Sequence, residues 1–172
     1  MESINALVHR TYRSKGFSLV ELLVVIALLA LMAGFAIPNV ARVMPKYRLK
    51  EAARDLYSNF QLAKITAIKE GAPCAVEFIN GGYKVFIDLN KNLQKDGNDT
   101  LIKQINWSEY KDVQVDSINF DNNDASNPAV CFLPAGIVIN KNGRLGNGSV
   151  ELKLANKQMK VVVNATSAVR IE

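Results

Sequence analysis

Residues 17–37 read FSLVELLVVIALLALMAGFAI, and this run decides how the first part of the chain folds. A helix of this length spans about 31 Å, close to the hydrocarbon thickness of a bilayer. The run is apolar around its whole circumference, which predicts that lipid or the interior of a helix bundle surrounds it. One ionisable residue, Glu21, lies near its start. A charge there is costly unless it is neutralised, lies near the headgroups or is paired.

The composition sets limits on the class of protein. The chain has 172 residues, of which 49% are hydrophobic and 22% charged, with a net charge of +5. This suits one folded domain plus a small extra element and excludes disorder as the main state. Two cysteines are too few for a disulfide-dense scaffold. A polytopic membrane protein is excluded, because only one stretch is long and apolar enough to span.

Beyond Pro38 the helical spacing of apolar residues continues to about residue 70, where Gly71 and Pro73 end the helix. Alternating runs then predict β-strands, with a hairpin turn at residues 80–82. The expected strands cover residues 74–79, 83–89, 101–107, 113–120, 129–133, 137–140, 149–155 and 159–165, and residues 121–128 form a polar loop. The predicted class is α+β: one long N-terminal helix, from about residue 17, whose second half packs on mostly antiparallel strands.

The string KGFSLVELL at residues 15–23 resembles the processing site of type IV pilins and type II secretion pseudopilins. The resemblance covers a basic leader, a glycine, a phenylalanine, a glutamate five residues after the cut and a long apolar helix. It implies cleavage between Gly16 and Phe17 by a prepilin peptidase at the cytoplasmic face, and N-methylation of Phe17. The new amine of Phe17 could pair with Glu21 of a neighbouring subunit. The alternative is that Glu21 only reaches toward the membrane interface.

The order of a long helix followed by many strands is similar to the FimT/GspH group of minor pilins and pseudopilins. Residues 131–136, CFLPAG, are similar to that group's Phe-x-Pro-x-Gly element. The resemblance implies a leader at 1–16, a transmembrane and filament-core helix at 17–38 and a pilin-like domain at 39–172.

The same resemblance implies a structural subunit that crosses the cell inner membrane once, with its domain in the periplasm or outside the cell. Its expected partners are the prepilin peptidase, the inner membrane and the other subunits of a pilus or pseudopilus. Enzymatic activity is not expected, because the only histidine, His9, lies in the leader and no glycine-rich phosphate loop follows a strand.

Two further groups of residues are candidate sites. Residues 88–99, DLNKNLQKDGND, offer oxygen ligands suited to Ca²⁺, but without the glutamate and glycine positions of an EF-hand. A calcium site and a solvated hairpin loop both stay open, and no other cofactor is expected. The calcium candidates are Asp88, Asn90, Asp96, Asn98 and Asp99. Cys74 and Cys131 lie on predicted strands and form either a disulfide or two buried thiols.

Two alternative functions remain. Some FimT-like pilins bind DNA, and these resemble one another in a basic Gly-Arg-x-Arg element near the C-terminus. Here only Arg170 matches that element, since Ser167 and Ala168 stand where Gly and Arg would be, so DNA binding is not favoured. A signal-anchored periplasmic protein is the third hypothesis, and it would have a mature N-terminus at Met1 or Ile37.

Overall fold

The structure is a computed structural model that describes residues 16–120 and 128–172, with side chains left out of the description at 35–42. It contains two compact units, Met1–Arg42 and Val43–Glu172. Among the residues whose side chains are described, every residue of the hydrophobic core lies in the second unit, which therefore has a core of its own.

Helix α1 (Leu19–Glu70) belongs to both units. It ends where Gly71 takes a φ of 63°, a left-handed conformation that glycine adopts without steric cost. Within the residues whose side chains the structure describes, no helix is both long enough and apolar enough to cross a membrane. The predicted span over residues 17–38 overlaps residues 35–42, whose side chains the structure does not describe.

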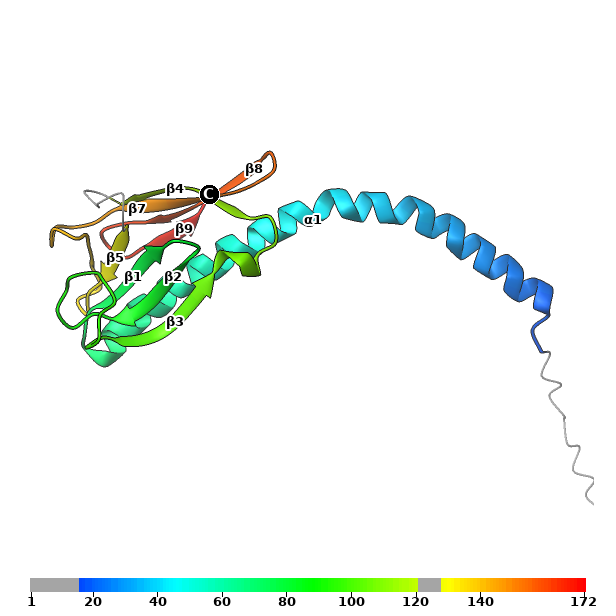
Figure 1. The fold of residues 1–172 in the computed structure, drawn as a ribbon. Coiled ribbons are helices and arrows are strands. Elements are labelled where there is room, and N and C mark those ends of the chain that lie inside the picture. The colour runs from blue at the N-terminus through cyan, green and yellow to red at the C-terminus, as the bar shows by residue number, and fades with distance from the viewer. Residues whose placement is uncertain (1–15, 121–127) are drawn as a thin grey trace, which may run out of the picture. The chain divides into compact units, whose positions relative to one another are not determined.

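Within residues 16–120 and 128–172, nine strands form two sheets, which Figure 1 shows, and the strand pairs are antiparallel. One sheet has the order β3-β2-β1-β5-β6 and the other the order β4-β7-β8-β9. The strands are β1 (Cys74–Ile79), β2 (Gly82–Ile87), β3 (Thr100–Asn106), β4 (Gln114–Phe120), β5 (Ala129–Phe132), β6 (Val138–Ile139), β7 (Gly148–Leu154), β8 (Lys157–Val163) and β9 (Val169–Ile171). A short 3₁₀ helix, η1 (Trp107–Glu109), follows β3.

The β1–β2 hairpin needs its glycines. Gly81 has a φ of 82°, and the strands pair directly beyond the turn, where Ile79 lies opposite Gly82. A Cβ on Gly82 would lie 2.1 Å from the carbonyl oxygen of Ile105 on β3. Any side chain at Gly82 would therefore push β3 away from β2.

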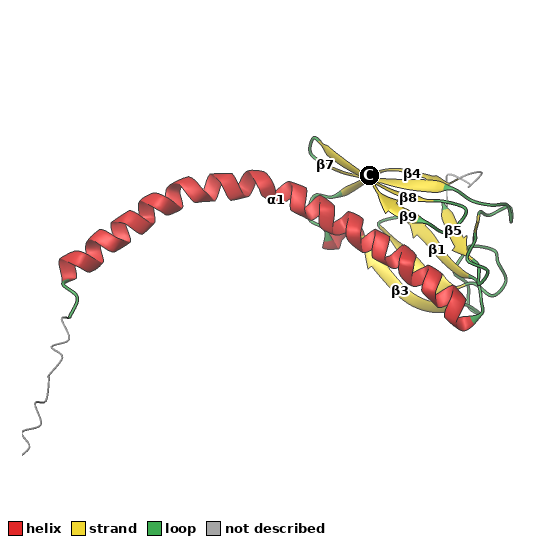
Figure 2. Ribbon diagram, turned by 180° about the vertical axis from the view of Figure 1, so that it is seen from behind, coloured by secondary structure: helices red, strands yellow, loops and turns green. Residues whose placement is uncertain are grey.

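The main core lies between the second half of α1 and one face of each sheet. Leu56 and Phe60 of α1 are fully buried there, and Phe60 contacts the rings of Phe78 and Phe132. Figure 2 shows this part of α1 lying across the sheet that contains β1 and β3. Hydrogen bonds from α1 to the rest of the unit add to the packing, for example between Asn59 Nδ2 and the hydroxyl of Tyr83 at 2.7 Å.

A second, smaller core lies on the other face of the β3-β2-β1-β5-β6 sheet. It consists of Ala75, Phe86, Leu93, Ala129, Cys131 and Ile139. Leu93 comes from the loop after β2, and only 1% of it is exposed. This loop therefore covers the sheet face that α1 does not.

The predicted α+β class and antiparallel strands are confirmed, with one long helix before the strands. Most strand bounds differ from the predicted ones by one or two residues, and two further details differ from the expected elements. The strand predicted at 101–107 ends at Asn106 and passes into η1, while β9 lies in a stretch with no predicted strand. β9 has only three residues, too few for an alternating pattern to be recognised. The polar loop expected at 121–128 lies mostly outside the described residues.

Candidate functional site

The chain changes from extended backbone to helix directly after the predicted cleavage point. Gly16, Phe17 and Ser18 are non-helical and exposed, and α1 begins at Leu19. Phe17 is 83% exposed, so a peptidase can approach the bond from solvent or lipid. A Cβ built on Gly16 meets no atom within 4 Å, so the chain itself has room for a larger residue there.

Ser18 caps the helix. Its hydroxyl oxygen accepts a hydrogen bond from the Val20 N–H at 3.3 Å, and its carbonyl accepts one from the Leu22 N–H at 3.1 Å. Sequence reasoning missed this residue, although the spacing Ser18-x-x-Glu21 matches a capping box and could have identified it.

Glu21 lies in the first turn of α1, where a carboxylate faces the positive end of the helix dipole. Its side chain is exposed in the isolated chain and free to meet a group outside its own subunit. The structure thus places Gly16, Phe17 and Glu21 within one short segment, while the basic leader residues lie outside the described range.

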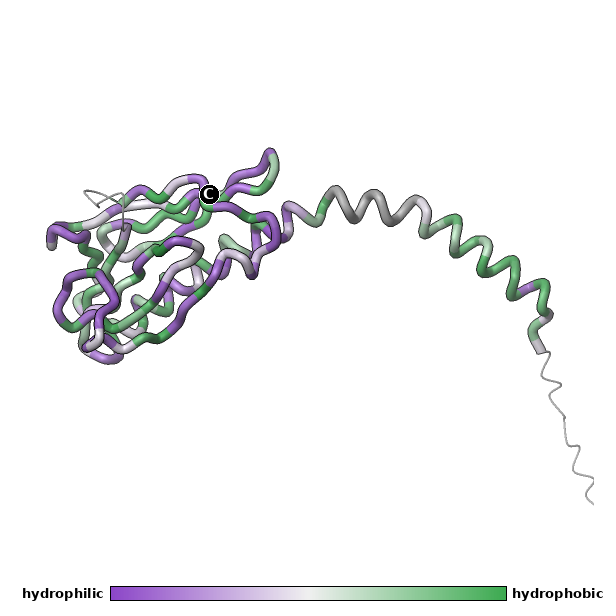
Figure 3. The backbone as a smooth tube through the Cα atoms, viewed as in Figure 1, coloured by the Kyte–Doolittle hydropathy of each residue, from purple (hydrophilic) through white to green (hydrophobic). Residues whose placement is uncertain are grey.

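Apart from Glu21, residues 19–34 of α1 carry apolar side chains or glycine on all sides, and all of these residues are exposed. Figure 3 shows this stretch as almost wholly hydrophobic, interrupted by one polar position near its start. The large exposed apolar residues are Phe17, Leu19, Val20, Leu22, Leu23, Val24, Val25, Ile26, Leu28, Leu29, Leu31 and Met32. Folded proteins rarely leave so much continuous apolar surface in water. This surface therefore fits association with lipid or with other helices.

The loop at residues 88–99 is held by its aspartates. The buried Asp88 carboxylate accepts the Leu93 N–H at 2.9 Å and the Asn92 N–H at 3.3 Å. The Asp99 carboxylate accepts the N–H groups of Asp96 at 2.9 Å and Leu89 at 3.3 Å. These bonds fold the loop so that Leu93 enters the second core.

The other predicted calcium ligands also take part in this network. The Asp96 carboxylate accepts the Asn98 N–H at 2.9 Å and the side-chain amide of Asn90 at 2.7 Å. The pKa of Asp96 is lowered, first by the Asn98 hydrogen bond. In the described part of the chain, no three acidic, cysteine or histidine side chains are grouped as metal ligands. The carboxylates face N–H donors, and calcium binding by this loop stays a prediction.

Cys74 and Cys131 are both buried and both free, which rules out the disulfide alternative in this fold. The reason is their register. Cys131 of β5 lies opposite Ala75 of β1, one residue beyond Cys74. Because successive strand residues point to opposite faces, Cys74 lies in the main core and Cys131 in the second core. Sequence alone could not give this one-residue offset.

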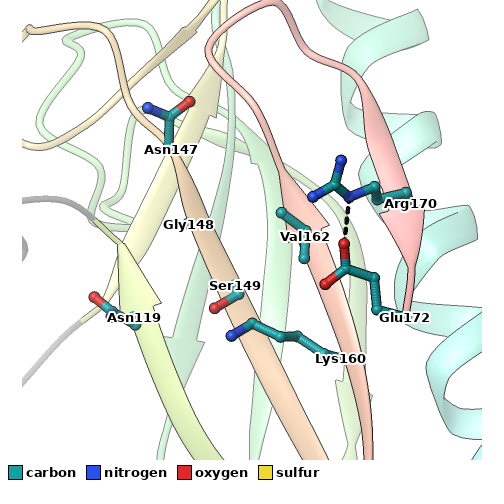
Figure 4. Close-up of a pocket in the computed structure, with 8 residues that line it drawn as sticks. All are labelled: Asn119, Asn147, Gly148, Ser149, Lys160, Val162, Arg170 and Glu172. Atoms are coloured by element: carbon teal, nitrogen blue, oxygen red, sulfur yellow. Dashed lines mark ion pairs between the residues drawn. The ribbon is translucent and has the colours of Figure 1, made fainter.

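Arg170, the one residue that matches the DNA-binding element, lies on β9 at the polar face of the β4-β7-β8-β9 sheet. Its Nε is 2.7 Å from Oε1 of Glu172, as Figure 4 shows. The nearby Lys160 is paired with Glu151 at 2.8 Å. Arg170, Glu172 and Lys160 border an open pocket of about 320 Å³ together with two asparagines and a serine. Each cation thus already has an acidic partner, which weakens its attraction for phosphate.

Comparisons with known proteins agree with this arrangement. Residues 52–167 match the family model described as "Type II transport protein GspH". The chain belongs to the GspH family. Residues 11–37 of this GspH-family chain also match the model of the prokaryotic N-terminal methylation motif, which covers the segment from the leader through Glu21. The resemblance stated from the sequence is therefore confirmed.

Individual relatives show the same kind of protein. "Pilin-like protein PilA1" of Thermus thermophilus is 30% identical over 104 residues, which are 56% of this chain and 65% of that protein. The GspH-family chain thus matches slightly less than two thirds of that relative's length.

Among solved structures, the type IV minor pilin FimU of Pseudomonas aeruginosa has the same fold. Its TM-score is 0.54 at 9% identity, over 74% of this chain and 90% of that one. The minor pseudopilin EpsH of the type 2 secretion system of Vibrio cholerae gives a TM-score of 0.48 at 20% identity, over 73% of this chain and 96% of that one. The chain is thus a GspH-family protein with an N-terminal methylation motif, as the sequence resemblance implied, and its domain has the fold of a type IV minor pilin.

Proposed function

We propose that this protein is made as a precursor, held in the cell inner membrane by residues 17–38 in a single pass, and cleaved between Gly16 and Phe17 by a prepilin peptidase. The methylated chain then joins the filament, with its domain in the periplasm or outside the cell, and acts as a structural subunit rather than as an enzyme. The observation that carries this proposal is the exposed, non-helical Gly16–Phe17 bond in front of a helix whose residues 19–34 are apolar except for Glu21.

Cleavage adds water across this peptide bond, so that Gly16 ends in a carboxylate and Phe17 begins with an amine. The nitrogen of that amine then attacks the methyl group of a sulfonium-type donor, the carbon–sulfur bond breaks, and the donor leaves as a neutral thioether. The nitrogen gives up one proton in exchange and stays basic. The amine is positive at neutral pH, and in a helix bundle it needs an acidic partner. Glu21 meets that need, because its side chain is exposed on α1 one turn after Phe17.

Glu21 has the role of fixing the axial position of an incoming subunit. Removing one partner of a charge pair within an apolar helix bundle destabilises the bundle by about 3–5 kcal/mol, because the other charge stays buried without a partner. A subunit without this carboxylate would leave the neighbouring subunit's amine buried and unpaired. Such a subunit would therefore be incorporated poorly into the filament.

The test compares wild type with Glu21→Ala in cells that contain the peptidase and the filament machinery. We expect intact mass spectrometry to find both proteins trimmed to a methylated Phe17, and sheared filaments to contain wild type but little Glu21→Ala. Glu51→Ala, which removes another exposed acid of α1, is the matched control and should be incorporated normally. An untrimmed wild-type chain, or equal incorporation of Glu21→Ala, would refute the proposal.

A further inference from the structure

We infer that Ser18 is a positioning residue for processing. Its hydroxyl fixes the start of α1 beyond the bond to be cleaved and so keeps the Gly16 carbonyl available to the peptidase. This inference rests on the proposed function, because it assumes cleavage between Gly16 and Phe17.

The Val20 N–H has two possible acceptors near the cleavage point. In a continuous α-helix this group would donate to the carbonyl four residues earlier, which is that of Gly16. In the structure it donates to Oγ of Ser18 instead, at 3.3 Å. The Ser18 hydroxyl and the carbonyl at the cleavage point therefore compete for the same donor, and the hydroxyl holds it.

The backbone around this bond shows the result of that competition. The Leu22 N–H donates to the Ser18 carbonyl at 3.1 Å, a regular helical bond, so the α-helical ladder starts at Ser18. Gly16 and Phe17 stay outside the ladder and exposed. If the helix began two residues earlier, its first turn would enclose the bond between Gly16 and Phe17. If it began two residues later, part of the present first turn would lose its helical hydrogen bonds.

The chemistry of cleavage explains why this matters. The oxygen of a water molecule bonds to the Gly16 carbonyl carbon, the bond to the Phe17 nitrogen breaks, and that nitrogen takes a proton. During attack the carbonyl oxygen becomes negative and needs hydrogen-bond donors of the enzyme placed around it. A Gly16 carbonyl inside a helical turn would have its oxygen occupied by Val20 and its faces crowded by that turn.

The apolar surroundings strengthen the effect. An N–H group without a partner is costly away from water, so the Val20 N–H will find another acceptor if the hydroxyl is removed. The Gly16 carbonyl is the acceptor that helix geometry offers. Loss of the hydroxyl thus favours a helix that is longer at its start and encloses the cleavage point.

The test measures the initial rate of leader removal from the full-length chain in membranes that contain the prepilin peptidase. We expect Ser18→Ala to be processed about fivefold more slowly than wild type, the factor that an N-cap of ordinary strength gives. Ser18→Thr and Ser18→Asn keep a capping oxygen and should stay within about twofold of wild type. Ser58→Ala, an exposed serine later on α1, is the matched control and should not change the rate.

Amide hydrogen exchange of the uncleaved chain supplies a second readout. If loss of the hydroxyl extends the helix to Gly16, as we infer, Ser18→Ala slows amide exchange at Val20. Faster exchange at Val20 would show that the helix start frays instead, and it would contradict the inference. Equal processing rates for wild type and Ser18→Ala, or a slow Ser18→Thr, would overturn the inference. A wild-type chain that is not cleaved at all would refute the proposed function instead, so the two failures are distinguishable.

Discussion

Burial governs the chemistry of the two cysteines. It raises the pKa of Cys74 to about 12, and the nearby Asp88 carboxylate raises it further. Burial also raises the pKa of Cys131, with added effects of Asp88 and Cys74. Since the thiolate is the reactive form, both side chains are inert in the folded protein.

We therefore expect the 43–172 fragment to show no reaction with a colorimetric thiol reagent at pH 8, and two reactive thiols per chain after denaturation. The fragment contains both cores and is suited to this assay. Non-reducing mass spectrometry provides the control, because a disulfide would lower the mass by two hydrogens. A fragment that has no free thiols even when unfolded would contradict the register of β1 and β5.

Asp88 predicts an unusual pH dependence. Burial raises its pKa, the hydrogen bond from the Leu93 N–H opposes this, and Asp99 adds to the increase. The folded state therefore takes up the proton before the unfolded state does, and it gains stability as the pH falls through the folded pKa. Wild type should gain unfolding free energy relative to Asp88→Asn between pH 7 and about pH 4.

Urea unfolding of the 43–172 fragment at several pH values measures this difference. Asp96→Asn is the control, because the pKa of Asp96 is lowered. Wild type should lose stability relative to it only as the pH falls below about 4, through the folded pKa. Parallel pH profiles for wild type and Asp88→Asn would show that the carboxyl is not buried as described.

At the scale of elements, the second half of α1 is the part on which both sheets depend. Phe60 is fully buried between Phe78 and Phe132, whereas Ile65, on the same helix, is 60% exposed. Phe60→Ala should lower the unfolding free energy of the fragment by about 3–5 kcal/mol, since it leaves a cavity among aromatic rings. Ile65→Ala should change it by less than about 0.5 kcal/mol. Similar losses for both would mean that α1 packs through another face.

Local patterns predicted the elements well where they were strong. The helical spacing and the Gly71–Pro73 stop gave α1, and the alternation around Gly81 gave the first hairpin. The partition of strands between two sheets could not be predicted, because it depends on pairing between residues far apart in sequence. The same limit applies to Cys74 and Cys131, whose faces depend on the register between β1 and β5.

The candidate site was predictable to a similar extent. The residues of the cleavage point came from a motif, and Ser18 could have come from its capping spacing. The role of residues 88–99 could not, because a run of aspartates and asparagines suits a metal site and a hydrogen-bonded loop equally well. Only the position of Leu93 in the second core shows what this loop covers.

For the whole molecule, the two units differ in the apolar surface that they expose. The first exposes apolar side chains along its helix, while the second buries its own core. We expect the 43–172 fragment to sediment as a monomer without detergent, and the chain from Phe17 onward to associate unless detergent is present. Analytical ultracentrifugation of both measures this. A fragment that forms stable dimers would show that the domain carries an assembly surface of its own.

The closure of the second core by a loop also has a practical use. A tag inserted into residues 88–99 would unseat Leu93, so that loop is a poor place for any label. The tip between β7 and β8, at Ala155 and Asn156, is exposed and belongs to neither core. Since both native thiols are shielded, a single cysteine introduced as Asn156→Cys would be the one position that a maleimide dye reaches in the described part of the domain. A growing filament can then be followed by fluorescence without replacing either native cysteine.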